Sequence, residues 1–318
     1  MMGTMKENRG TEMAENQKLW NQICRIAGSD NVFAREPMQK HTTFRIGGPA
    51  DYFVLPHSRE EVRSLVGLCR DEGIPYFIMG NGSNLLVSDE GFRGVIIQIY
   101  KNMASIEVEG CNIRAGAGAL LSRISRKAAD AGLKGMEFAS GIPGTLGGAL
   151  TMNAGAYGGE MKNILEEAEI LTEDGTFRIL KAEELEMGYR TSLVAKEHYT
   201  VLQGVLKLEK GNKEEILAAM DGLKEQRVSK QPLEYPSAGS TFKRPEGYFA
   251  GKLIMDAGLR GFTVGGAQVS EKHCGFVINK GNATAADVRT LMEEVTRRVE
   301  EQFGVRLEPE VKMLGEFK

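Results

Sequence analysis

The segment Gly141–Gly159, with the sequence GIPGTLGGALTMNAGAYGG, decides how the rest of this chain is interpreted. It is rich in glycine, yet apolar side chains such as Ile142 and Leu146 are spread through it. A flexible linker would combine glycine with serine and would have few apolar residues. Glycine is needed where a side chain would prevent close approach or where φ must be positive. The composition therefore predicts backbone shaped around a ligand, and a set of tight turns in the core remains the alternative.

Two other glycine-rich turns follow expected strands. Gly80-Asn81-Gly82-Ser83-Asn84 comes directly after a predicted strand at 75–79, and Gly116-Ala117-Gly118 follows one at 111–115. Consecutive backbone N–H groups in such a loop can bind an anion, and a diphosphate is the natural guest. The first loop fits neither the Walker nor the Rossmann pattern, and alone it could be a plain hairpin turn. Three such turns in adjoining lobes predict a long, folded dinucleotide, and FAD fits that shape.

Composition excludes several classes of protein. The chain has 318 residues, 42% hydrophobic and 26% charged, with a net charge of -3. We therefore expect a globular protein of more than one domain, with no nucleic-acid partner. The four cysteines are scattered without metal-ligand spacing, so we expect reduced thiols and no metal site. No stretch approaches the roughly 18 apolar residues of a membrane span, which predicts a cytoplasmic protein without a membrane partner.

Helix and strand signals divide the chain into an extension, two lobes and a third region. Residues 1–16 carry few large apolar side chains, so we expect a disordered extension. The first lobe, the second lobe and the third region are predicted at residues 17–100, 101–224 and 225–305.

Predicted helix caps and turns support this division. Ser58, Asn212 and Thr284 are the predicted N-caps of three helices, and Gly304 is the predicted stop of the last one. Asp174-Gly175 predicts the turn of a β-hairpin. Residues 305–314 alternate between apolar and polar residues, as a strand does.

Several separated motifs resemble, in the same order, those of the UDP-N-acetylenolpyruvoylglucosamine reductase (MurB) family, also called UDP-N-acetylmuramate dehydrogenase. The resemblance runs from about Thr42 to the C-terminus. Besides the 80–84 loop and the segment at 141–157, it rests on Thr43-Phe44-Arg45-Ile46-Gly47-Gly48, Gly188-Tyr189-Arg190-Thr191-Ser192, Ala238-Gly239-Ser240-Thr241-Phe242-Lys243 and Leu307-Glu308-Pro309-Glu310-Val311.

The resemblance implies an α+β fold, with a two-lobed FAD-binding domain of the vanillyl-alcohol-oxidase (PCMH) type before a smaller α+β substrate-binding domain. It also implies that the tail at 306–318 returns to the active site. We expect non-covalent FAD, because neither His nor Cys lies near the glycine-rich turns to tether it. The residues expected to contact FAD are Gly80, Asn81, Gly82, Ser83, Asn84, Gly116, Gly118, Gly141, Ile142, Gly144, Thr145, Gly147, Gly148, Asn153, Gly155 and Ala156.

The reaction that the resemblance implies passes hydride from NADPH through FAD to a UDP-sugar enolpyruvyl ether, a step of peptidoglycan precursor synthesis that needs no obligate protein partner. Arg190 would stabilise the developing negative charge, and Ser240 would donate the proton. Glu310 would act beside the substrate carboxylate. Tyr189 and Lys230 are expected substrate contacts. Without the resemblance, the three catalytic candidates would be read as a surface cation, a turn serine and a solvated strand residue.

The chain departs from one group of the family. It continues past Phe242 without the longer insertion that closes a tyrosine loop over the substrate, so it is similar to the shorter class. Two other functions remain open. One is an FAD-dependent alcohol or sugar oxidase on the same flavin fold, and the other is a nucleotide-binding module without catalysis.

Overall fold

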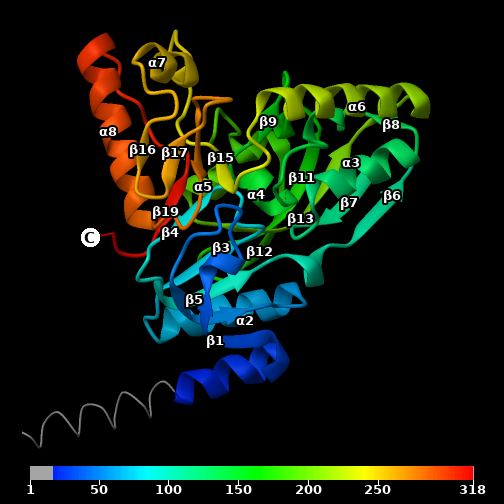
Figure 1. The fold of residues 1–318 in the computed structure, drawn as a ribbon. Coiled ribbons are helices and arrows are strands. Elements are labelled where there is room, and N and C mark those ends of the chain that lie inside the picture. Colours follow the sequence, from blue (N-terminus) through cyan, green and yellow to red (C-terminus); the bar gives the residue numbers. More distant parts are fainter. Residues whose placement is uncertain (1–16, 318) are drawn as a thin grey trace, which may run out of the picture.

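The computed structural model describes residues 17–317. Residues 17–27 are helical and precede a four-stranded sheet with the order β1-β2-β5-β3 (Figure 1). Its central strand, β5, pairs in parallel with both neighbours, and its run of Val95, Ile96 and Ile97 is fully buried. Such continuous apolar runs are typical of strands covered on both faces. The strands and the helix of this lobe are β1 (Val32–Pro37), β2 (Pro49–Val54), α2 (Arg59–Asp71), β3 (Tyr76–Met79), β4 (Leu85–Val87) and β5 (Phe92–Gln98).

Helix α2 begins where the sequence predicts. The Ser58 side chain accepts a hydrogen bond from the Glu61 N–H, while the Glu61 carboxylate binds the N–H of His57 instead of that of Ser58. The cap is therefore confirmed, without the reciprocal bond of a capping box. One stripe of the helix is buried and consists of Val62, Leu65, Val66 and Cys69.

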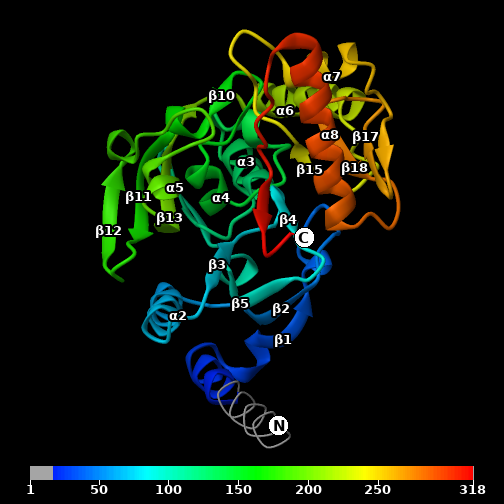
Figure 2. The same cartoon turned by 90° about the vertical axis from the view of Figure 1, so that its left-hand side faces the viewer.

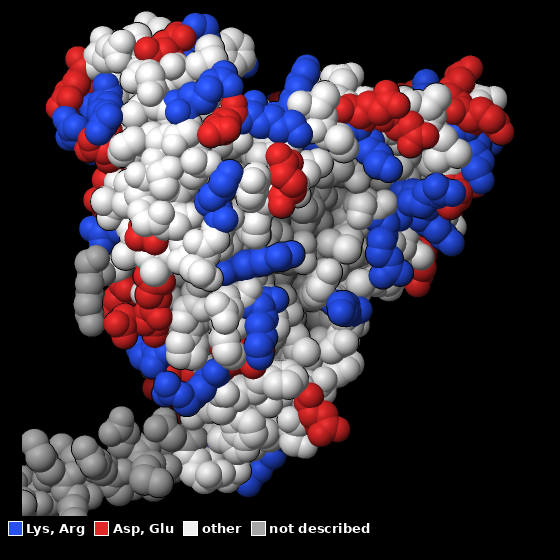
Figure 3. All heavy atoms as spheres, viewed as in Figure 1, with Lys and Arg blue, Asp and Glu red and all other residues white. Residues whose placement is uncertain are grey.

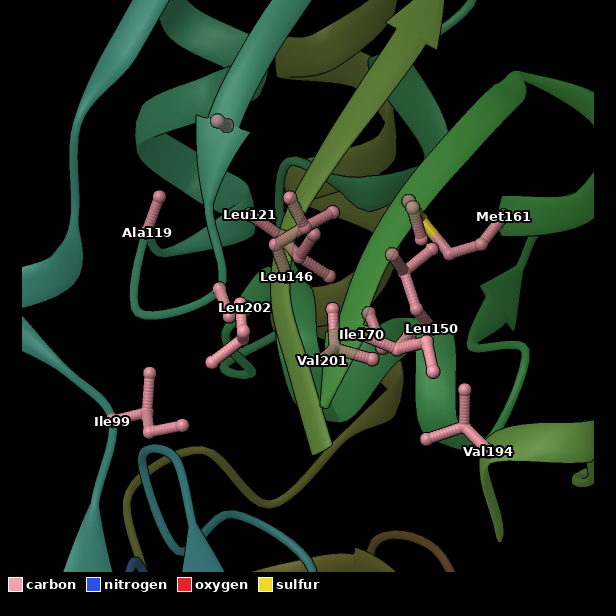
Figure 4. Packing of buried hydrophobic residues seen from close by; sticks show 14 of the residues in the cluster. Ile99, Ala119, Leu121, Leu146, Leu150, Met161, Ile170, Val194, Val201 and Leu202 are labelled. Carbon is pink, nitrogen blue, oxygen red and sulfur yellow. The ribbon is translucent and has the colours of Figure 1, made fainter. Parts of the chain in front are cut away.

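The second lobe is an antiparallel sheet with the order β12-β11-β13-β7-β6. Its predicted hairpin is confirmed, because β11 and β12 pair on either side of the Asp174-Gly175 turn. Helix α4 packs its Leu146 and Leu150 over Val201 of β13 (Figure 4). The main elements are β6 (Ile106–Glu109), β7 (Asn112–Gly116), α3 (Leu121–Asp130), α4 (Leu146–Thr151), β11 (Leu165–Leu171), β12 (Phe177–Lys181), β13 (Thr200–Lys207) and α6 (Lys213–Lys230).

Shorter elements connect these. They are the strands β8 (Leu133–Lys134), β9 (Gly155–Ala156), β10 (Gly159–Glu160) and β14 (Glu209–Lys210), the helix α5 (Leu193–Lys196), and six 3-10 turns at Ser29–Asn31, Met38–Lys40, Lys101–Met103, Glu137–Ala139, Met161–Asn163 and Ala182–Leu185. The N-cap of α6 is confirmed, since the Glu215 N–H donates to the Asn212 side chain. Helix α6 runs on past residue 224 and ends at Lys230.

The third region packs a small sheet, ordered β15-β18-β17-β16, against two helices. Its helix α8 is capped by Thr284 in a capping box with Asp287 and ends at Gly304 with φ 67°, as predicted. The elements are β15 (Ser237–Ser240), α7 (Ala250–Asp256), β16 (Thr263–Val264), β17 (Ala267–Val269), β18 (Phe276–Asn279) and α8 (Ala285–Phe303).

The motif at 43–48 joins the first lobe to the third region. Phe44 and Ile46 are buried in the hydrophobic cluster of the third region. The Thr43 hydroxyl donates to the Ser237 carbonyl at 2.7 Å, and the Asn279 amide donates to the Phe44 carbonyl at 3.2 Å. This motif therefore fixes the third region against the first lobe.

The C-terminal tail runs from the end of α8 down beside the third region to β4 of the first lobe (Figure 2). Only β19 (Lys312–Leu314) is a strand, and it pairs in parallel with β4. The strand expected over 305–314 is thus shorter than predicted. Residues 308–310 bond instead to the third region, where the Glu310 N–H donates to the Thr241 carbonyl and Glu308 accepts from Lys243. Pro309 has no N–H to donate to a ladder.

Candidate active site

A cavity of about 270 Å³ lies between the two lobes, and we call it the glycine cavity. Its walls come from the end of β3 and the loop after it, from the segment at 142–154, and from β13. The structure therefore brings together two of the three predicted turns, while the third turn reaches the cavity through Ala117. The predicted cofactor residues that line it are Gly80, Asn81, Gly82, Ser83, Asn84, Ile142, Gly144, Thr145, Gly147 and Gly148.

The glycines of this cavity serve two different purposes. Gly82 has φ 62°, and a Cβ there would overlap the carbonyl oxygen of His41, so the protein's own packing requires glycine. A Cβ at Gly80 would likewise overlap the Thr145 hydroxyl. At Gly144 and Gly148, by contrast, the nearest atoms would lie 3.7 Å away. Among the glycines that line the cavity, only these two could carry a Cβ without a clash, so a ligand rather than the protein's own packing could require glycine there.

The side chains of the 80–84 loop make contacts that the sequence does not reveal. The Asn81 amide donates to the Pro143 carbonyl at 2.6 Å and so ties two glycine-rich turns together. The Asn84 amide donates to the carbonyl of Glu310 at 3.1 Å. The predicted loop therefore joins the tail of the chain as well as the segment at 141–148.

Six predicted cofactor residues do not line the glycine cavity: Gly116, Gly118, Gly141, Asn153, Gly155 and Ala156. A Cβ at Gly116 or Gly118 would overlap backbone at 100–103. The Asn153 side chain binds Glu160, the Gly188 carbonyl and the Lys162 N–H. Gly155 and Ala156 form β9, which pairs with β10. Their assignment as FAD contacts stays a prediction.

A second hollow, of about 410 Å³, is lined by Tyr189, Arg190, Ser240 and Glu310, and we call it the Arg190 pocket. Its catalytic candidates come from the turn after Gly188, from β15 and from the tail, so folding gathers residues 120 positions apart. The space-filling view shows a hollow on this face with Lys and Arg side chains along its edges (Figure 3). The exposed Lys230 ends α6 and does not line the pocket.

Arg190 and Glu310 form a close, mostly buried pair. Their Nε and Oε1 atoms lie 2.7 Å apart, and the two side chains are 22% and 9% exposed. Arg190 also has φ 57°, a strained conformation for a residue other than glycine. Strain of this kind is typical of functional sites.

Burial raises the pKa of the Glu310 carboxyl, although the positive charges of Arg190 and Lys243 oppose the shift. Removing a carboxylate from water disfavours its charged form, and here this effect outweighs the attraction. The carboxyl therefore holds a proton to higher pH than an exposed glutamate does.

The rest of the pocket is basic, which the sequence does not predict. Arg244, Lys252, Arg260 and Lys272 line it, and Arg244 lies 4.0 Å from the centre of the Phe249 ring. The Tyr189 hydroxyl accepts a hydrogen bond from the Arg244 N–H. These cations are spread over 29 residues of sequence without a common spacing, so only the fold of the third region gathers them. Four basic side chains suit an anionic ligand with more than one phosphate.

Comparison with known proteins identifies the family of this chain. Residues 50–181 match the family described as FAD binding domain, and residues 231–314 match the one described as UDP-N-acetylenolpyruvoylglucosamine reductase, C-terminal domain. The UDP-N-acetylenolpyruvoylglucosamine reductase of Agathobacter rectalis is 56% identical over 294 residues, which cover 89% of this chain and 93% of the relative. The chain belongs to the UDP-N-acetylenolpyruvoylglucosamine reductase family.

Other members agree with this result. The reductase of Lachnoclostridium phytofermentans is 52% identical over 95% of this chain and 98% of its own length. The crystal structure of UDP-N-acetylenolpyruvylglucosamine reductase (MurB) from Thermus caldophilus superposes with a TM-score of 0.76 at 39% identity, over 88% of this chain and 98% of that chain. This reductase is therefore an FAD-binding oxidoreductase. The expected α+β fold class, with a flavin domain of the PCMH type before the substrate domain, is confirmed.

The glycine cavity of this reductase fits FAD. Apolar side chains such as Ile142 and Val201 form much of its wall, which suits a flat aromatic ring system. Gly144 and Gly148 leave backbone open for close approach. Neither His nor Cys lines the cavity in the described part of the chain, so those residues offer no tether there.

Two further properties concern residues 17–317 alone. Within that range, there is no cluster of His, Cys, Asp or Glu that could hold a metal ion. The same range includes no helix long and apolar enough to cross a membrane.

Proposed function

We propose that this chain reduces UDP-N-acetylglucosamine enolpyruvate to UDP-N-acetylmuramate with NADPH as the reductant. The observation that carries the proposal is the buried Arg190–Glu310 pair, which shares a pocket with Ser240. The same tail that supplies Glu310 also lines the glycine cavity through Lys312. An anionic substrate beside the pair would therefore also lie beside the flavin.

FAD, when bound, supplies two-electron chemistry by accepting a hydride from one ligand and giving it to another. The chain's own groups must then control charge at the carbon that receives the hydride. Addition to the terminal carbon of the enol ether pushes negative charge toward the neighbouring carbon and its carboxylate. The Arg190 guanidinium, held beside Glu310 in the pocket, is suited to stabilise that charge.

Glu310 and Ser240 handle protons in this proposal. A protonated Glu310 can donate a hydrogen bond to the substrate carboxylate, and its raised pKa supports that role. The Ser240 hydroxyl, on β15 at the wall of the pocket, would donate the proton that completes the lactyl ether. A serine is a weak acid, so this step requires a strongly basic carbon and close placement.

The basic wall of the Arg190 pocket supports the assignment of the ligands. UDP-sugar and NADPH both carry a diphosphate, and Arg244, Lys252, Arg260 and Lys272 could pair with it. We propose that NADP⁺ leaves before the sugar nucleotide binds in the same pocket. Tyr189 lies in this pocket as a candidate contact, whereas Lys230 would have to reach it from the end of α6.

The proposal extends to the setting of the reaction. We place it in the cytoplasm, as a step of peptidoglycan precursor synthesis, without an obligate protein partner, nucleic acid or membrane. Lobes at 17–100 and 101–224 would hold FAD, and the region at 225–305 would hold the substrate, with the tail at 306–318 between them. The expected extension at 1–16 lies outside the described residues.

The visible spectrum of the purified protein tests this function. NADPH should bleach the flavin, and the enolpyruvyl sugar nucleotide should restore its colour in the absence of oxygen. Acid precipitation should release yellow flavin into the supernatant, because attachment is expected to be non-covalent. A flavin that ignores NADPH and is instead reduced by an alcohol or a sugar would identify an oxidase of the same fold and end the proposal.

A further inference from the structure

Lys312 is the single charged side chain on the wall of the glycine cavity, counted over the described residues. It is the first residue of β19 and is exposed. Among residues 17–317, its ammonium group has no ion-pair or hydrogen-bond partner. A cofactor with a charged diphosphate and a ring that gains electrons therefore meets the positive charge of one lysine in this cavity.

The backbone fixes Lys312 at the border between the two sites. Its N–H donates to the Asn84 carbonyl at 3.0 Å, and β19 places it opposite Leu85 of β4. Two residues earlier, Glu310 lines the Arg190 pocket, and its carbonyl accepts from the Asn84 amide. One short extended segment thus reaches the Arg190 pocket with Glu310 and the glycine cavity with Lys312.

This placement indicates which end of FAD meets the ammonium group. Hydride transfer requires the donor and acceptor atoms to approach to about 3–3.5 Å. The isoalloxazine end of the cofactor must therefore lie toward Arg190 and Glu310, which is the side of the cavity that holds Lys312. The inference rests on the proposed function to this extent.

We propose that Lys312 is the counter-charge of the reduced isoalloxazine and makes FAD easier to reduce. A hydride from NADPH brings two electrons and one proton, so NADP⁺ leaves and the flavin gains one negative charge. When the hydride passes to the substrate carbon, that charge passes with it; the Ser240 proton then goes to the neighbouring carbon, and the Ser240 oxygen, left with the charge, takes a proton from water. A nearby ammonium group binds the reduced cofactor more tightly than the oxidised one, and a preference of this kind raises the reduction potential.

The test compares Lys312→Met, which removes the charge at similar length, with Lys312→Arg, which keeps it. Lys210→Met is the matched control, because Lys210 ends the exposed strand β14 and does not line the glycine cavity. The FAD-loaded proteins are titrated against reference dyes without substrate, and the dissociation constants of oxidised and reduced FAD are measured. We expect Lys312→Met to lose about tenfold in preference for reduced FAD, or about 30 mV for a two-electron couple.

Each result of this test supports or overturns the inference. Lys312→Arg and Lys210→Met should keep the native potential, and Lys312→Met should bind oxidised FAD nearly normally. If Lys312→Met weakens both redox forms equally, the ammonium group pairs with the diphosphate and the inference is wrong. An unchanged potential and unchanged affinity overturn it as well. If the native protein itself binds no FAD, the result refutes the proposed function instead.

Discussion

The glycine cavity and the Arg190 pocket are built by opposite means. The wall of the cavity is mostly backbone and apolar side chain, and Lys312 is its single charged residue within the described range. The wall of the pocket carries six charged side chains, including the Arg190–Glu310 pair. The two volumes are of the same order, about 270 and 410 Å³. Size therefore does not distinguish them, but polarity does.

This difference separates two kinds of recognition. The cavity suits a cofactor that stays bound, since shape and apolar contact hold a flat ring. The pocket suits ligands that must alternate, since charge and hydrogen bonds can be made and broken with each turnover. The tail holds the two together through Asn84, which lines the cavity and binds the Glu310 carbonyl.

The largest expected effect belongs to the pocket alone. Ser240→Ala should still be bleached by NADPH at a nearly normal rate, because hydride acceptance needs no proton donor to carbon. Reoxidation by substrate should slow by about 10²–10⁴-fold, the usual loss when a positioned general acid is removed. Stopped-flow absorbance of the flavin follows both steps.

Ser237→Ala is the matched control for this variant. Ser237 lies on the same strand, β15, but does not line the pocket, and only its carbonyl binds Thr43. Both half-reactions should stay native in the control. Near-normal reoxidation of Ser240→Ala would remove Ser240 as the proton donor.

The next largest effect is expected at Glu310. Burial of its carboxyl determines in which direction the rate of reoxidation changes with pH. Because its pKa is raised, the protonated form persists at low pH and is lost as pH rises through the raised value. Substrate-dependent reoxidation should therefore fall on the alkaline side. Glu310→Gln cannot ionise, so that alkaline decline should disappear. The maximal rate should drop about tenfold, because the glutamine amide can still donate to the substrate carboxylate but is a weaker donor than a carboxylic acid. An unchanged decline in the variant would assign the titration to another group.

The sequence predicts features that depend on neighbouring residues better than features that depend on the fold. Caps such as Ser58 and Thr284 are satisfied within three residues, so local spacing predicts them. Gly144 and Gly148 lie in one glycine-rich turn, and composition alone marks it. Arg190, Ser240 and Glu310 lie on three distant segments, and only the resemblance to a family selected them. Lys312 and the basic wall of the pocket were missed, because their role depends on which elements fold side by side.

Gly148 is a better position than Gly82 for testing the glycine cavity. Substitution at Gly82 would strain the protein itself, since a Cβ there overlaps the His41 carbonyl. At Gly148, within α4, the nearest atom would lie 3.7 Å from a Cβ, an ordinary van der Waals distance, so an added methyl group meets no clash within the protein. Gly148→Ala should therefore fold with equal or greater stability, because alanine favours helix. One methyl group in the cofactor's space should weaken FAD binding about tenfold.

Gly222→Ala is its control. Gly222 lies within α6, has no atom near its Cβ position and does not line the cavity. Flavin fluorescence titration and thermal unfolding compare the two variants. Loss of stability in Gly148→Ala without loss of flavin affinity would show that the space beside Gly148 is not used by FAD.

The smallest expected effect concerns a contact between the first lobe and the third region. The Asp89 carboxylate, which follows β4, accepts hydrogen bonds from the N–H groups of Ala285 and Ala286 at 2.8 and 3.0 Å. The first lobe therefore supplies a cap for α8 of the third region, beside the cap that Thr284 provides locally. A lost cap typically costs about 1 kcal/mol. Asp89→Ala and Thr284→Ala should each lower the melting temperature by roughly 2–4 °C.

The two cap variants should differ in catalysis. Of these two caps, the one from Asp89 joins the first lobe to the third region, whereas the one from Thr284 lies within the third region. Asp89→Ala loosens the contact that orients the third region, so substrate-dependent reoxidation should slow about threefold, which is about 0.6 kcal/mol in the barrier. Under the proposal that NADPH and the substrate use the same pocket, bleaching by NADPH should also be slower in Asp89→Ala than in Thr284→Ala. Rates are compared in stopped flow at a temperature where both variants are fully folded. Equal rates in the two variants would mean that the motif at 43–48 and the tail hold the regions in register without Asp89.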